Sequence, residues 1–474
     1  MSRDTSALRY GTAAGRGALT AIVLASGLAF LDTTVVNIAL PAIGRQFDVG
    51  FSAMQWTVNA YLLTFGSLLL LGGGLGDRFG RRRIFLLGLA SFSLFSVCCG
   101  LAPNILALIA MRAAQGAAAA VLIPGSFAMI ATIFHGEDRS RAVATWSALV
   151  GTAAAAGPFI GGWLIDAASW RLVFLINVPI TITSFCLAYR YFPDRPAETS
   201  STRLDLRGAA TVTIGLTGII YAIIEGPLRG WRHPGIVVAG TTGVAFLLLF
   251  FRIEQVVPHP MMSLRLFHNQ EFSAANLLTL GVYAGYNAAL FITVLQLQIS
   301  LGYSALAAGA ALIPIELFLL ILSPWVGRMA YRIGCWRLLT IGPLLCAGGF
   351  LLLADVSSGA SYISGVLPGV VLFSLGFALT VAPLSTTVLG SVAPRYVGVG
   401  SGVNNATARV GGLLAIALLP AVAGASAFST LNEDRFTHVF ERTMWQAAGL
   451  CAIGGLIGLY VVLSSRRSPL SPVT

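Results

Sequence analysis

The chain has 474 residues, of which 56% are hydrophobic and only 10% are charged. Soluble domains carry about 25% charged residues, so this composition excludes an ordinary water-soluble protein. The formal net charge of +11 comes with 29 basic residues that are all arginine, and such a charge indicates a nucleic-acid partner only where the basic residues gather on one face.

Apolar stretches of bilayer length recur from one end of the chain to the other. A membrane-crossing helix needs about 20 mostly apolar residues, and polar segments divide the chain into about fourteen such stretches. In chain order, their predicted limits are 19–41, 52–75, 84–102, 104–128, 142–164, 170–190, 208–225, 235–252, 272–296, 304–326, 337–354, 362–390, 399–422 and 443–464. The predicted fold class is an all-α integral membrane protein with 14 spans.

The arginines fall mainly on one side of this predicted topology. If the first span leaves the cytoplasm, 21 of them lie in cytoplasmic segments, six lie outside, and Arg112 and Arg409 lie within apolar spans. Such an excess is the positive-inside bias. It predicts a multi-pass protein of the inner or plasma membrane with both termini in the cytoplasm, and it explains the net charge without nucleic acid.

The chain divides into two similar parts around a central pair of spans. The predicted domains are an N-terminal six-helix bundle (1–190), a connector with two extra transmembrane helices (191–271), a C-terminal six-helix bundle (272–464) and a cytoplasmic tail (465–474). Repeated halves are typical of secondary transporters.

A weak internal repeat supports this division. After the second span, Gly73 is followed four residues later by Asp77, and after the tenth span Gly327 is followed four residues later by Tyr331. The second copy therefore has no acid at the matching position.

Four ionisable side chains lie at mid-depth in the predicted spans. Asp32 and Glu316 lie near the centres of the first and tenth spans, and Arg112 and Arg409 lie deep in the fourth and thirteenth. Charged groups in hydrocarbon cost at least about 2.5 kcal/mol each. Burial favours a neutral carboxyl and a nearby guanidinium favours a carboxylate, so a carboxyl that moves between these situations can carry a proton. We predict that these four residues carry proton coupling.

The alternative for the two acids is a structural role beside hydroxyls or amides. For Arg112 it is a structural tether to the backbone or to Asp32, and for Arg409 it is pairing across the interface. Pro314, two residues before Glu316, is expected to bend that helix and expose backbone carbonyls that a protonated carboxyl could bind.

Six sequence segments in chain order carry a resemblance to a known family. They are LDTTVVNIALP (31–41), GGLGDRFGRRR (73–83), LIAMRAAQG (108–116), GPFIGG (157–162), WRLVFLINVP (170–179) and GSGVNNATARVGG (400–412). The chain resembles the fourteen-spanner drug:proton antiporters of the major facilitator superfamily, and IIEGPLRGW (223–231) is similar to antibiotic-resistance exporters of the methylenomycin type. The resemblance implies a major facilitator fold, with two six-helix bundles plus two extra central transmembrane helices.

The resemblance also implies gating roles for two glycine-containing motifs. The residues concerned are Gly73, Asp77, Arg78, Gly80, Arg81, Gly157, Pro158, Gly161 and Gly162. In the first motif Asp77 interrupts a run of arginines, which favours a gating salt bridge or helix-end contact over a purely topogenic cluster. In the second, Gly157 and Pro158 are implied to bend the fifth span and to keep the empty cavity from leaking protons, although small residues also simply let helices pack closely.

Polar and aromatic residues inside spans are the candidates for substrate binding. They are Asn37, Gln55, Trp56, Asn59, Tyr283, Asn287, Phe291, Asn404 and Asn405. Gln55 and Asn59 share a helix face, as do Tyr283 and Asn287, and mainly apolar linings with a few polar groups suit amphipathic ligands. Interhelical hydrogen bonding is the alternative for each. Glu225 is expected to be an interfacial acid beside Arg229 and Arg232.

These observations predict a proton-coupled antiporter that exports hydrophobic or amphipathic drugs or antibiotics. The alternatives are a dedicated exporter of one metabolite and a proton-coupled uptake symporter. A membrane enzyme is not expected, because the five histidines are scattered in loops and the six cysteines lack metal or disulfide spacing. The expected partners are a small-molecule substrate, protons and the lipid bilayer, with no nucleic acid, no metal and no cofactor beyond the proton gradient; the sequence leaves open an accessory periplasmic partner.

Overall fold

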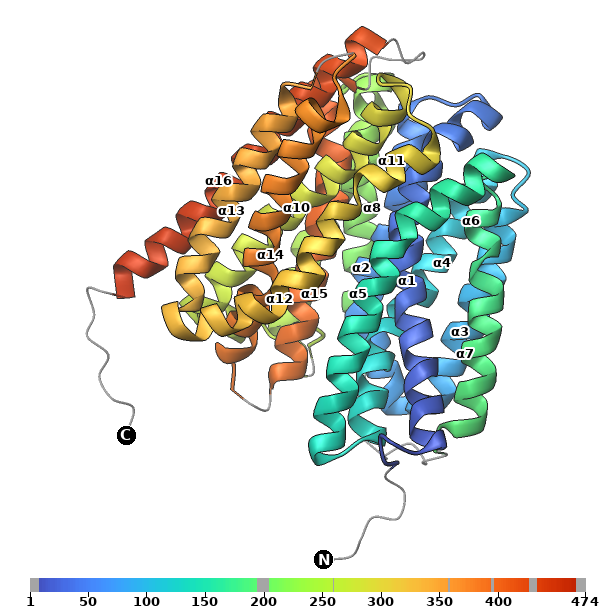
Figure 1. The fold of residues 1–474 in the computed structure, drawn as a ribbon, viewed down its shortest axis with the longest axis vertical. Coiled ribbons are helices and arrows are strands. Elements are labelled where there is room, and N and C mark those ends of the chain that lie inside the picture. The colour runs from blue at the N-terminus through green and yellow to red at the C-terminus, as the bar shows by residue number, and fades with distance from the viewer. Residues whose placement is uncertain are drawn as a thin grey trace, which may run out of the picture. The chain divides into compact units, whose positions relative to one another are not determined.

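The computed structural model describes residues 8–193, 204–258, 260–356, 359–393, 396–425 and 433–465. Within these ranges the chain is nearly all helical (Figure 1), and 14 helical segments are long and apolar enough to cross a membrane. The predicted all-α class with 14 spans is confirmed. Most of the predicted tail (465–474) and part of the connector after the sixth span lie outside the described residues.

The helices follow one another along the chain with short connections. They are α1 Ala13–Phe47, α2 Phe51–Phe79, α3 Arg81–Gly100, α4 Ile105–Ile133, α5 Gly136–Ala167, α6 Leu172–Leu175, α7 Asn177–Tyr191, α8 Leu206–Arg229, α9 Pro234–Val256, η1 Leu264–His268, α10 Gln270–Ile299, α11 Ala305–Ala311, α12 Ile313–Ile333, α13 Cys335–Ala354, η2 Tyr362–Val366, α14 Leu367–Gly390, α15 Val397–Ala423 and α16 Glu433–Ser465. Several are longer than the predicted spans, because helices continue past the apolar core that hydropathy detects.

Side-chain caps fix where several of these helices begin. The Thr12 hydroxyl accepts a hydrogen bond from the Gly15 N–H at 3.0 Å before α1. Asn104 accepts from Ala107 N–H at 2.9 Å before α4. Such caps bind N–H groups that have no partner inside the helix. The polar residues between the apolar stretches therefore stop and restart the helices.

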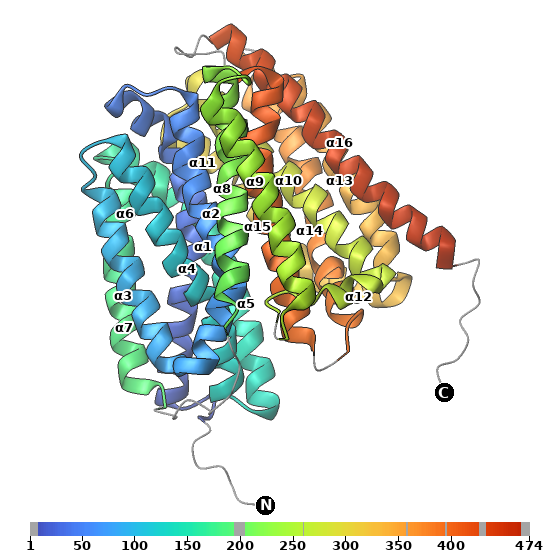
Figure 2. The ribbon, with the colours of Figure 1, turned by 180° about the vertical axis from the view of Figure 1, so that it is seen from behind.

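The described residues divide into two compact units. The first contains residues up to Met262 together with Tyr303–Ala310, and the second contains Ser263–Gly302, Ala311–Ala425 and the described residues from 433 onward. The extra helices α8 and α9 pack against each other (Figure 2) and belong to the first unit. The four predicted domain ranges stay a prediction.

Small residues allow the closest helix contacts in the first unit. A Cβ atom on Gly72 in α2 would collide with the Ala120 carbonyl oxygen of α4, and one on Gly116 in α4 would collide with the Tyr61 carbonyl oxygen of α2. Close approach through small residues is how membrane helices associate without a hydrophobic driving force. This packing brings the polar residues of α2 and α4 next to α1.

Two of the described spans are interrupted near their first residues. The sixth span consists of α6 and α7, and the tenth consists of α11 and α12, which are separated at Leu312. Pro314 lies in the first turn of α12, two residues before Glu316. The expected bend therefore falls at the start of a new helix, where a proline's missing N–H costs no hydrogen bond.

Candidate functional site

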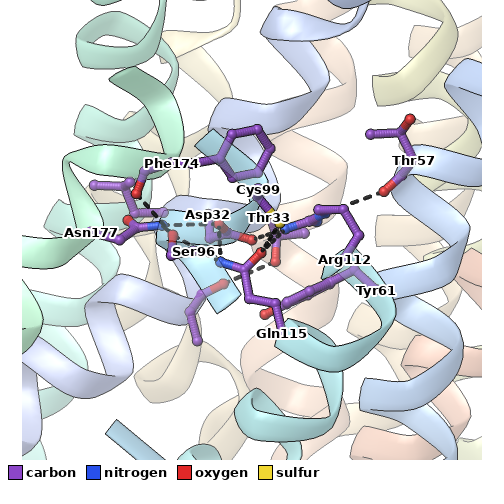
Figure 3. A network of polar contacts seen from close by, with 12 residues as sticks. Asp32, Thr33, Thr57, Tyr61, Ser96, Cys99, Arg112, Gln115, Phe174 and Asn177 are labelled. Carbon is purple, nitrogen blue, oxygen red and sulfur yellow. Dashed lines mark hydrogen bonds and ion pairs between the residues drawn. The ribbon is translucent and has the colours of Figure 1, made fainter. Parts of the chain in front are cut away.

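A buried ion pair joins α1 to α4 in the first unit. Arg112 Nη1 lies 2.6 Å from Asp32 Oδ2, and the two side chains are 1% and 0% exposed. Figure 3 shows the guanidinium directed at the carboxylate. The structure brings together the two predicted coupling residues of this half.

The guanidinium has neutral partners besides the carboxylate. Arg112 donates to the Thr57 carbonyl at 3.2 Å and to Gln115 Oε1 at 2.8 Å. Its guanidinium carbon also lies 4.2 Å from the centre of the Tyr61 ring, which is a cation–π contact. Arg112 is therefore held from α2, α1 and its own helix.

The other oxygen of Asp32 accepts hydrogen bonds from two amides. Gln115 Nε2 donates to Oδ1 at 3.0 Å and Asn177 Nδ2 donates at 3.1 Å. Both amides also contact Ser96 Oγ, which donates to the Phe174 carbonyl. The carboxylate thus sits in a network from α1, α3, α4, α6 and α7 (Figure 3). A buried ion pair needs such additional hydrogen bonds to offset its desolvation.

Sequence reasoning missed Ser96, Gln115 and Asn177. Gln115 lies three residues after Arg112 on the same face of α4, so helical periodicity was an available signal. Asn177 lies within the WRLVFLINVP segment, and Ser96 had no signal apart from being polar in an apolar span. The network can hold a buried charge.

Glu316 in the second unit has a different environment. It is partly exposed, and within the described part of the chain it makes no hydrogen bond or ion pair. Glu316 and Arg409 both act electrostatically on the hydroxyls of Tyr283 and Tyr286. The two predicted acids are therefore not equivalent, because one is locked in an ion pair and the other is not.

The GPFIGG segment of α5 packs closely against α1 on one side and α11 on the other. A Cβ atom on Gly157 would meet the Thr34 hydroxyl of α1 at 2.5 Å, and one on Gly161 would collide with the Val35 side chain. A Cβ atom on Gly162 would lie 2.5 Å from the Ala305 carbonyl oxygen of α11. Close packing is thus part of this motif's role, and its predicted gating role stays a prediction.

One acidic side chain strengthens the contact between α5 and α11. Asp166 accepts hydrogen bonds from the backbone N–H groups of Ala305 at 3.1 Å and Leu306 at 2.8 Å. These are the first N–H groups of α11, which have no partner within the helix. Pro158 also lies close to α11, since a Cβ on Gly309 would meet its carbonyl oxygen.

The motif at the junction of α2 and α3, which was expected to be a loop, contains an exposed ion pair. Arg81 Nη2 lies 2.9 Å from Asp77 Oδ1, with side chains 39% and 50% exposed. Arg81 also bonds the Thr132 hydroxyl of α4. Gly80 has φ +94°, a conformation that side-chain-bearing residues avoid, so it separates α2 from α3. Gly73 and Arg78 lie in the last turns of α2.

Three predicted substrate residues of α1 and α2 are buried, namely Asn37, Gln55 and Asn59, and the fourth, Trp56, is half-buried. Asn37 and Asn59 each have side-chain amide atoms without a hydrogen-bond partner among the described residues, and Gln55 is 2% exposed. Trp56 donates its indole N–H to Glu225 of α8 at 3.1 Å. Glu225 also pairs with Arg229 at 3.1 Å, one of the two arginines it was expected to lie beside, and it connects α8 to α2 through Trp56.

The predicted substrate residues of α10 and α15 mostly bond to helices of the second unit. Asn404 donates to Asn276 and Thr279 of α10. Asn287 and Asn405 each donate to a carbonyl four residues earlier in their own helix, and Phe291 is fully buried. Interhelical and intrahelical bonding therefore accounts for these amides in this conformation.

An aromatic cluster of the second unit borders a small cavity. Tyr286 stacks on Phe377 with ring centres 4.6 Å apart, and Tyr283 meets Phe377 edge-on at 5.7 Å. The cavity is small, about 20 Å³, and its wall includes Tyr286, Thr293 and Phe373. Its lining is almost entirely apolar. Among the described residues no His, Cys, Asp and Glu cluster could hold a metal ion.

Comparison with known proteins agrees with this architecture. The family model described as Major Facilitator Superfamily matches residues 22–416. The chain is 37% identical to a cephamycin export protein of Amycolatopsis lactamdurans, covering 95% of this chain and 94% of that protein. It is 36% identical to a methylenomycin A resistance protein of Bacillus subtilis, covering 84% and 85%.

A solved structure shares the fold at low sequence identity. The crystal structure of a peptide transporter POT in complex with sulfate superposes with a TM-score of 0.71 at 14% identity, covering 98% of this chain and 97% of that chain. At this identity the likeness concerns the fold alone.

Proposed function

Because the chain belongs to the Major Facilitator Superfamily, we propose that this multi-pass membrane protein exports a hydrophobic or amphipathic drug or antibiotic in exchange for protons. The relatives named for cephamycin export and methylenomycin A resistance support the export direction and the substrate class. The proposed location is the cell membrane, with both termini in the cytoplasm, as the distribution of arginines predicts.

The buried Asp32–Arg112 pair carries the proton-coupling part of the proposal. An ion pair with both side chains fully buried costs desolvation free energy in an apolar bundle. Its presence therefore favours a role that hydrophobic residues could not serve. If a proton binds Asp32, the attraction to Arg112 is lost and the guanidinium turns to the neutral acceptors that already contact it, Gln115 and the Thr57 carbonyl. Protonation of Asp32 can therefore rearrange α1 against α4.

Glu316 is the second proton-binding group of the proposed cycle. It has no ion pair within the described residues and lies near the aromatic cluster around Tyr286. A proton from outside neutralises Glu316 or Asp32 and disfavours substrate binding, and loss of that proton to the cytoplasm restores the charged state. Coupling follows if protons and substrate prefer different conformations.

No cofactor beyond the proton gradient and no enzymatic reaction is part of this proposal. Protons, the substrate and the bilayer are its partners. A dedicated exporter of one antibiotic is the second candidate, since both named relatives are named for a single compound.

The proposal is tested by expressing the chain in a bacterial strain that lacks its own drug pumps. Intracellular accumulation is measured for a panel of amphipathic compounds, with Arg112→Gln as the inactive control. We expect lower accumulation of at least one compound, restored by an uncoupler of the proton gradient. Unchanged accumulation across the panel, at verified membrane expression, would contradict export. Lower accumulation of a single compound would favour the dedicated exporter.

A further inference from the structure

Two carboxyl groups meet at the end of the hairpin formed by α8 and α9. Asp205 is the N-cap of α8, and its Oδ1 accepts a hydrogen bond from the Gly208 N–H at 2.8 Å. Glu254 lies in the last turn of α9, and its Oε2 accepts from the Met262 N–H at 2.8 Å. One oxygen of each carboxyl is therefore bound to the backbone.

The second oxygen of each carboxyl is buried without a hydrogen-bond partner among the described residues. These atoms are Asp205 Oδ2 and Glu254 Oε1, and Glu254 is only 3% exposed. Both point to one place, because a Cβ atom on Gly208 would lie 2.6 Å from Oδ2 and 2.8 Å from Oε1. Glycine at this position leaves open the space that both oxygens border.

No positive charge balances these groups among the described residues. Neither carboxyl forms an ion pair there, and Asp205 of α8 is the charged group that acts on Glu254. The segment after α9 contributes the backbone N–H groups of Met261 and Met262. Two buried carboxylates facing each other repel strongly, and such pairs hold one proton between them.

We propose that Asp205 and Glu254 share one proton, which makes this end of the hairpin a proton-binding site separate from Asp32. The proton forms an O–H···O bond between Oδ2 and Oε1 and so satisfies both unpartnered oxygens. A divalent cation fits less well, because Mg²⁺ keeps several waters and both oxygens are closed to solvent.

The shared proton fastens the start of α8 to the end of α9 and to the segment that follows it. In the unfolded chain both carboxyls are ionised at neutral pH, so the folded protein binds one more proton than the unfolded one. Stability from this site therefore falls as pH rises. The anchoring of the extra hairpin thereby depends on the proton concentration at this face of the protein.

The test compares thermal unfolding of the full chain in detergent with that of Glu254→Gln and Asp205→Asn. Either amide can donate to the remaining carboxylate and so mimics the protonated pair. At about pH 6 we expect each variant to unfold within about 2 °C of the unmodified protein, and at about pH 8.5 we expect the unmodified protein to fall below both variants. Glu137→Gln, which changes an exposed glutamate paired with Arg141, is the matched control and should follow the unmodified protein.

Infrared spectroscopy gives an independent readout. The unmodified protein and the Glu137→Gln control should show a protonated carboxylic acid C=O band that is absent from both Glu254→Gln and Asp205→Asn. No difference in this band, or parallel loss of stability with pH in all four proteins, would overturn the proposal. It would also be overturned if MgCl₂ alone stabilised the unmodified protein but not Glu254→Gln, because the pair would then bind a cation.

Discussion

Replacing Asp32 by asparagine leaves Arg112 as an uncompensated buried charge. The guanidinium is 1% exposed and would lose its contact to Oδ2 at 2.6 Å, while the Thr57 carbonyl, Gln115 and the Tyr61 ring would remain. Removing one partner of a buried ion pair costs about 3–5 kcal/mol. Because three neutral contacts persist, we expect the free energy of unfolding to fall by about 3 kcal/mol, the lower end of this range. The unfolding equilibrium constant would then rise roughly a hundredfold.

The assay is a double-mutant cycle of unfolding free energies in detergent micelles. Asp32→Asn, Arg112→Gln and the double variant are compared with the unmodified protein. The double variant removes both charges, so it should be more stable than the sum of the single losses predicts, with a coupling energy of about 1–3 kcal/mol. Additive losses in the double variant would refute the reasoning, since the two side chains would then not depend on each other.

Further substitutions separate packing from charge. Gly162→Ala places a methyl group against the backbone of α11 and should destabilise the protein by about 1–3 kcal/mol, whereas Gly327→Ala, with open space around its Cβ, should be nearly neutral; equal effects in thermal unfolding would contradict this. Trp56→Phe removes the indole N–H bonded to α8 and should cost about 1 kcal/mol, with faster proteolysis of the α8–α9 region; unchanged proteolysis would count against the anchor. Asp77→Asn breaks an exposed ion pair worth at most about 1 kcal/mol, so its stability should match that of the Glu137→Gln control while export is lost. Retained export at equal expression would mean that the motif only sets the membrane topology.

The span count was predictable because hydropathy reports it directly. Bilayer length and apolar composition determine each span, and charged or polar residues mark its ends. The positions of the helix breaks were harder to predict from the sequence than the number of spans. Pro314 indicated a bend near Glu316, and Pro179, in the first turn of α7, was the corresponding signal for the break between α6 and α7.

The candidate site was only partly accessible from the sequence. Asp32 and Arg112 were visible as charges at mid-depth, and the structure pairs them. Their depth alone did not predict that Glu316 would have a different environment, because pairing depends on which neighbours tertiary packing provides. Trp56 was expected in a substrate site, and its bond to Glu225 depends on the position of α8, which composition does not specify.

Proton movement during substrate export tests the central claim most directly. The purified chain is reconstituted into liposomes that contain a pH-sensitive dye, and an exported compound is added with no imposed gradient. We predict that substrate movement drives protons in the opposite direction, and that Asp32→Asn combined with Glu316→Gln abolishes this proton flux while passive substrate exchange persists. Proton flux of normal size in the double variant, or substrate transport by the unmodified protein without any proton flux, would contradict proton-coupled export through these residues.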